Sequence, residues 1–145
     1  MRPLSSTDFL RSHFALLSTL TSAPALAPTA YTQLFNSLRV PTSTARAMYY
    51  IVCIIHKATD QLVACGTLIF EQKFIHSGGK AGHIEDIVVD SKMQGLGLGG
   101  KLIKGLKDLA VALGCYKVIL DCKEDKTGSF CCFSPIVRRL IFCFL

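Results

Sequence analysis

The sequence predicts a single α/β domain in which two helices precede a mixed β-sheet. Three features lead to this fold class. Apolar residues recur at helical spacing up to Leu38, strand-like runs joined by short turns follow, and a glycine-rich loop, a helical stripe and a further strand come last. Strands joined by short turns are antiparallel neighbours, whereas a strand that follows a helix can return parallel through a right-handed crossover. The expected sheet is therefore an antiparallel meander with one parallel β–α–β crossover.

The composition allows one folded core and narrows the classes of function. Half of the 145 residues are apolar, and the mean hydropathy of +0.42 excludes a disordered chain. The net charge of +6 suits an anionic small molecule but is too dispersed to indicate nucleic-acid binding. The seven cysteines form no CxxC pair and the histidines show no metal-binding spacing, so no metal is expected. With no secretion signal or apolar stretch of membrane-spanning length, we expect free thiols and a cytoplasmic location.

Two amphipathic helices are expected in the N-terminal part. Ser6 or Thr7 can cap the first helix, whose opening turn carries Asp8. A loop rich in proline and alanine at positions 21–28 separates it from the second helix, which Pro28 can begin. The apolar residues at helical spacing are Phe9, Leu10, Phe14, Leu17 and Leu20 in the first helix and Tyr31, Leu34, Phe35 and Leu38 in the second.

Strands and a crossover helix follow. β-Branched and aromatic residues predict the strands, and Gly66 marks a possible bulge in the second of them. The crossover helix is expected to open at Lys101 and to stop at Gly114, which can adopt the left-handed conformation that ends helices. The expected strands are Met48–His56, Leu62–Gln72, Gly82–Val89 and, after the helix and parallel to the third, Tyr116–Cys122.

The stretch from Gln94 to Gly100 contains four glycines directly before the crossover helix. Glycines leave backbone N–H groups open to close approach by a ligand. The start of the helix adds unpaired N–H groups and the positive end of its dipole. The stretch therefore predicts a phosphate or pyrophosphate site, with a flexible turn as the alternative that a glycine loop alone leaves open.

A dinucleotide-binding oxidoreductase is a rival interpretation of the same loop. Gly95, Gly97 and Gly100 satisfy GxGxxG, and Asp121 lies where a ribose-binding acid would fall. Two features count against it. Residues 90–94 separate the loop from the preceding strand, and an antiparallel meander comes before the unit that should open such a fold.

A family resemblance explains more of the chain. Gln94-x-x-Gly97-x-Gly99 stands between an antiparallel meander and a helix, and further motifs follow the same order: Lys73 to His76, His83 to Val89 and Gly114 to Cys122. Together these segments resemble the GNAT N-acetyltransferases, in particular those that acetylate glucosamine 6-phosphate. The resemblance covers about residues 2–122. It implies the GNAT fold, acetyl-CoA as co-substrate, no metal, and a homodimer.

The resemblance also implies roles for individual residues. Glu85 would contact the sugar near its amine, directly or through water, and Asp121 would orient the amine. The period of a strand would place Glu85 and Asp86 on opposite faces of the sheet. The implied cofactor-binding residues are Ile87, Val88 and Val89, through their backbone, and Gln94, Gly95, Leu96, Gly97, Leu98, Gly99 and Gly100. The implied substrate-binding residues are Thr21, Lys73, His76, Glu85, Asp86, Tyr116, Lys117 and Asp121.

The last part of the chain departs from this pattern. The family domain is expected at residues 1–122, and residues 123–145 form a hydrophobic tail that replaces the family's last strands and resembles read-through into foreign sequence. The family's tyrosine, which hydrogen-bonds the leaving thiolate, has no counterpart because no tyrosine follows Tyr116. Two functions therefore stay open: an acetyltransferase impaired at its C-terminus, and a catalytically dead isoform that still binds acetyl-CoA.

Overall fold

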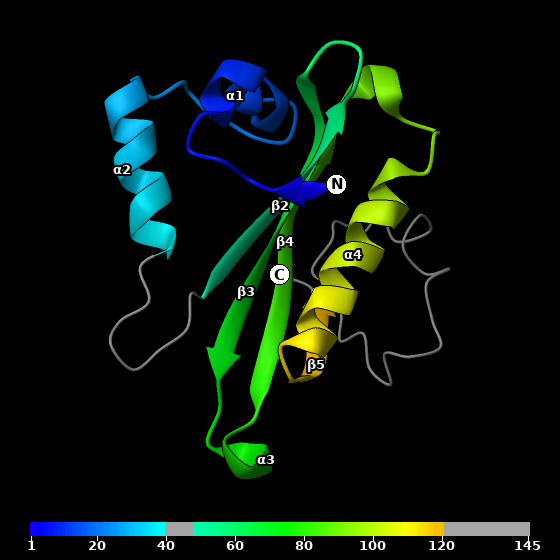
Figure 1. Ribbon diagram of the computed structural model, residues 1–145. Coiled ribbons are helices and arrows are strands. Elements are labelled where there is room, and N and C mark those ends of the chain that lie inside the picture. Colours follow the sequence, from blue (N-terminus) through cyan, green and yellow to red (C-terminus); the bar gives the residue numbers. More distant parts are fainter. Residues whose placement is uncertain (40–47, 121–145) are drawn as a thin grey trace.

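The computed structural model describes residues 1–39 and 48–120, which form a five-stranded mixed sheet with helices on both faces (Figure 1). Neighbouring strands follow the chain order and are antiparallel from β1 to β4, whereas β5 runs parallel to β4. The predicted meander with one parallel crossover is confirmed. The strands are β1 Arg2–Pro3, β2 Tyr49–His56, β3 Gln61–Gln72, β4 Lys80–Val89 and β5 Cys115–Leu120.

Some expectations lie outside the described residues. These are the position of Asp121, the boundary at residue 122 and the tail at 123–145. Within the described ranges, no helix is both long and apolar enough to cross a membrane.

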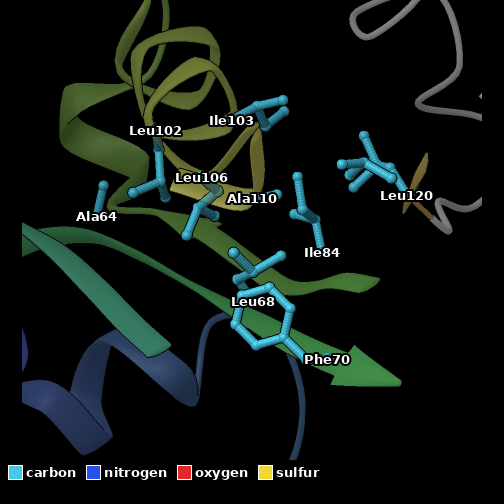
Figure 2. Close-up of a cluster of buried hydrophobic side chains, with 10 residues drawn as sticks. Ala64, Leu68, Phe70, Ile84, Leu102, Ile103, Leu106, Ala110 and Leu120 are labelled. Carbon is cyan, nitrogen blue, oxygen red and sulfur yellow. The ribbon is translucent and has the colours of Figure 1, made fainter. Parts of the chain in front are cut away.

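Helix α4 (Leu98–Ala112) packs on one face of the sheet and forms the larger core with it. Leu102 and Leu106 lie on one stripe of the helix and are fully buried. They pack in one cluster with Leu68 of β3 and Ile84 of β4 (Figure 2). This face anchors the strand on which the candidate site lies.

The ends of α4 differ in how far the sequence predicted them. The helix begins at Leu98, three residues before the expected Lys101. This start could not be predicted because the first turn includes glycines, which have a low helix propensity. The helix ends as expected: Leu113 is the C-cap, and Gly114 follows it with a φ of 82°.

The opposite face of the sheet is covered by α1 (His13–Leu17) and α2 (Pro28–Arg39). The second helix is confirmed, but one continuous first helix is wrong. A 3₁₀ turn, η1 (Asp8–Arg11), precedes α1, and Ser12 breaks the two apart with a left-handed φ of 62°. Thr7 makes no capping hydrogen bond through its side chain. The carboxylate of Asp8 instead binds two arginines, which fixes the turn locally.

The pairing of β3 with β4 contains a bulge at the position of Gly66. Thr67 pairs with Glu85 and Cys65 pairs with Val88, so Gly66 alone stands opposite two residues of β4. The irregularity expected at Gly66 is therefore confirmed, although the extra residue belongs to the partner strand. A Cβ atom at Gly66 would collide with Cδ1 of Ile87, so a larger residue there would force the side chain of Ile87 to shift.

Candidate functional site

The glycine loop presents bare backbone at the start of α4. Gly95 and Gly97 have φ values of 80° and 71°, and a Cβ at either position would meet no atom within 4 Å. Gly97 is the N-cap of α4, and its carbonyl accepts the hydrogen bond of Lys101, so the amides of the first turn have no acceptor inside the helix. The loop can therefore surround an anion with N–H groups, as the sequence predicts.

The loop lies beside the end of β4. A Cβ built on Gly99 would be 3.7 Å from Cγ2 of Val89. On its β3 side, β4 is paired through to Val89. On its β5 side, pairing within the described residues reaches Ile84 and Leu120, and β4 continues for five residues beyond. The backbone of Glu85 to Val89 is thus placed to donate N–H groups to a ligand on that side.

Both carboxylates of β4 lie on the face of the sheet opposite α4. Glu85 pairs with Thr67 and shares its face, and Asp86 lines a cavity together with Thr67. The side chain of Ile87 lies against α4. The expected placement on opposite faces is wrong because the bulge inserts one residue, Asp86, with a φ of 53°. The structure thus brings two exposed carboxylates together on the part of β4 that has no partner on its β5 side within the described residues.

The residues expected at the sugar phosphate gather at the other end of β4. The rings of His76 and Tyr116 have centroids 4.2 Å apart, and Nζ of Lys117 is 5.7 Å from the Tyr116 centroid. Lys117 pairs with Ala81, four residues before Glu85, a separation of about 13 Å along the strand. We call Lys73, His76, Tyr116 and Lys117 the cationic group.

Thr21 does not lie near the cationic group. It is exposed and follows α1, whereas His76 belongs to α3 (Ile75–Gly78) at the opposite end of the sheet (Figure 1). The position of Asp121 is outside the described residues, but the preceding Leu120 pairs with Ile84, which is next to Glu85 in β4. In the described part of the chain, no three residues of metal-binding type cluster together.

Sequence reasoning missed a cavity of about 250 Å³ between α1, α2 and the sheet. Its lining includes Asp86, His13 and Tyr31, and Nδ1 of His13 is 3.0 Å from the Tyr31 hydroxyl. Burial lowers the pKa of His13 and raises that of Tyr31. The sequence places Tyr31 on an apolar helical stripe. Its hydroxyl is the signal that points to the cavity, because a buried tyrosine normally needs a hydrogen-bond partner.

The fold and the loop define a class of protein. The model of the acetyltransferase (GNAT) family matches residues 18–131, and the chain belongs to this family. Within the family it is similar to glucosamine 6-phosphate N-acetyltransferases. It is 37% identical to glucosamine 6-phosphate N-acetyltransferase 1 of Dictyostelium discoideum over 85% of this chain and 75% of that protein. The Arabidopsis thaliana enzyme is 36% identical over 86% of this chain and 81% of the relative.

The solved structures agree with this assignment. The crystal structure of glucosamine-6-phosphate N-acetyltransferase from Arabidopsis thaliana superposes with a TM-score of 0.82 at 32% identity, and the match covers 99% of this chain and 96% of that one. An acetyltransferase of Trypanosoma brucei gives a TM-score of 0.81 at 33% identity, covering 99% and 97% of the two chains. The expected GNAT fold is confirmed, and the doubly wound sheet of the dinucleotide interpretation is not the fold observed.

The loop yields a prediction with a matched control. In Gly97→Val, a β-branched residue at a left-handed φ costs about 1–3 kcal/mol of strain, and the loop relieves it by moving its amides. We expect calorimetry to show the Kd for CoA rising by about tenfold or more. Gly114→Val creates similar strain at the far end of α4 and should leave the Kd unchanged. Equal effects of the two variants on the Kd would contradict the loop as the binding site.

Proposed function

We propose that this chain transfers the acetyl group of acetyl-CoA to the amine of glucosamine 6-phosphate, giving N-acetylglucosamine 6-phosphate. The observation that carries the proposal is the arrangement of β4 around its bulge. Beyond Ile84 the backbone of β4 has no described partner on its β5 side, close to the glycine loop, and the bulge presents Glu85 and Asp86 on the face opposite α4. The similar enzymes named above support the choice of substrate.

The glycine loop would hold the diphosphate of acetyl-CoA through the amides of Gln94 to Gly100. The pantetheine would then run along β4. The thioester carbonyl would accept hydrogen bonds from backbone N–H groups of the segment Ile87 to Val89. These donors stabilise the negative charge that develops on the carbonyl oxygen as the amine attacks. The cofactor and the acceptor would thus approach β4 from different faces.

The reaction forms one C–N bond and breaks one C–S bond. The ammonium form of the sugar must lose a proton before it can attack, and Glu85 would accept that proton, directly or through a water molecule. Asp86 would contact the sugar beside it, and Asp121 would orient the amine. The departing thiolate takes up a proton. The family's tyrosine for that step has no counterpart after Tyr116, so we expect transfer to be slower by about a hundredfold than with such a donor.

The acceptor phosphate would bind the cationic group. Glu85 and Lys117 share a face of the sheet, so a sugar between them can present its amine to one and its phosphate to the other. Thr21 follows α1, which lies at the opposite end of the sheet from α3 (Figure 1). In the homodimer that the resemblance implies, a second copy of the chain would supply Thr21 to a sugar bound at the cationic group. A cytoplasmic location completes the proposal.

The second candidate is an isoform that binds acetyl-CoA without transferring its acetyl group. The missing tyrosine is the observation that favours it. An assay of CoA release separates the two functions. With acetyl-CoA and glucosamine 6-phosphate, we expect free thiol to accumulate together with N-acetylglucosamine 6-phosphate, identified by mass spectrometry. Tight binding of acetyl-CoA without any product would instead establish the binding isoform.

A further inference from the structure

Glu71 is shared between a lysine of the cationic group and a histidine. Its carboxylate accepts a hydrogen bond from Nζ of Lys73, and its second oxygen is 3.1 Å from Nε2 of His83. The hydrogen bond from Lys73, followed by that from His83, lowers the pKa of Glu71. All three side chains are only partly exposed. The ammonium of Lys73 is therefore already paired with an internal anion.

Glu71 lies within the face that the acceptor would use. It pairs with Ala81 of β4, and Ala81 pairs with Lys117 of β5, so the three form one row across the sheet. His83 is two residues further along β4, and Glu85 two residues beyond that, on the same face. Near Glu71 this face carries Lys73 and His83, with Lys117 on β5, and further along β4 it carries the carboxylates of Glu85 and Asp86.

We propose that Glu71 is a specificity-determining residue that competes with the acceptor's phosphate for the ammonium of Lys73. The proposal rests on the proposed function, because it assumes an acceptor that carries a phosphate. When the phosphate binds Lys73, the carboxylate gives up that ion pair and keeps its contact with His83. The negative charge of Glu71 also repels a dianionic phosphate ester more strongly than a monoanionic sulfate ester of the same sugar. Glu71 thereby narrows the preference of the site for phosphate over sulfate.

Calorimetry on the full chain saturated with CoA tests this. The probes are N-acetylglucosamine 6-phosphate and N-acetylglucosamine 6-sulfate. For Glu71→Gln we expect the Kd of the phosphate to fall about threefold and that of the sulfate to fall less, so that the preference for phosphate widens. The Kd for CoA should not change. Asp108→Asn is the matched control, because it removes the acid of an exposed pair, Lys104 with Asp108, on α4.

A second pair of variants tests whether the effect passes through Lys73. In a Lys73→Gln background, Glu71→Gln should no longer tighten binding of the phosphate. Unchanged or weaker binding by Glu71→Gln would overturn the inference, and so would equal tightening in the Lys73→Gln background. When the unchanged chain acetylates glucosamine 6-phosphate but Glu71→Gln has no effect, only the inference fails. When the unchanged chain binds neither of the two sugar esters and forms no product, both the inference and the proposed function fail.

Discussion

Glu85→Gln is expected to lower kcat for acetyl transfer by about a hundredfold or more, which is the usual contribution of a positioned general base. The amide keeps the size of the side chain but cannot accept the proton of the attacking amine. Because Glu85 is exposed on the face opposite α4, the change should leave the glycine loop and the fold intact. The KM for acetyl-CoA should therefore stay the same. Product formation followed by mass spectrometry over hours measures even a slow rate.

The control for Glu85 is another exposed acid far from the site. Asp108 lies on α4, where it pairs with Lys104, and Asp108→Asn should keep the full rate. A Glu85→Gln protein whose kcat stays within a factor of about three of the unchanged chain would show that this carboxylate is not the base.

Asp8→Asn is expected to lower the free energy of unfolding by about 2–3 kcal/mol. Asp8 is completely buried, and Arg2 donates to both of its carboxylate oxygens at 2.8 and 2.7 Å. The backbone N–H of Ser5 donates at 2.7 Å, and Arg11 at 3.3 Å. The estimate stands below the 3–5 kcal/mol typical of a broken buried pair because both arginines remain about one-third exposed and stay solvated.

Urea unfolding measures this difference, and Asp60 provides the control. Asp60 pairs with the same Arg11 at 2.9 Å but is 67% exposed, so Asp60→Asn should cost at most about 0.5 kcal/mol. Comparable losses in the two variants would contradict the assignment of stability to the buried carboxylate.

The contribution of Asp8 should also depend on pH. Burial raises the pKa of Asp8, but hydrogen bonds from Arg2 and the Ser5 amide and the charge of the arginines lower it, with a net decrease. A carboxyl group whose pKa is lower in the folded chain stabilises the fold above its unfolded pKa of about 3.9 and loses that effect as the pH falls through the folded value. The difference between Asp8→Asn and the unchanged chain should therefore be constant at neutral pH and shrink below about pH 4.

Features set by local sequence were predictable. Apolar spacing located α2 and α4, β-branched and aromatic residues located β2, and Gly66 marked the bulge. Features set by contacts between distant segments were not. One example is the ion pair between Asp8 and Arg2, which no periodic sequence pattern encodes. The break at Ser12 and the two-residue strand β1 accompany this ion pair.

The face of the sheet on which the two candidate carboxylates lie was also unpredictable. A non-glycine residue, Asp86, holds a left-handed φ there, and the simple alternation of a strand fails. The loop, by contrast, could be recognised because Gly95 and Gly97 adopt positive φ values that glycine permits. Candidate residues could therefore be named from the sequence, whereas the shared face of Glu85 and Asp86 could not be predicted.

A crystal of the protein soaked with acetyl-CoA tests the central claim most directly. We expect the diphosphate oxygens within hydrogen-bonding distance of the amides of residues 95–100, and the thioester carbonyl beside the amides of Ile87 to Val89, with Glu85 facing it from the other side of the sheet. A diphosphate bound away from the glycine loop, or a thioester far from the bulge in β4, would contradict the account.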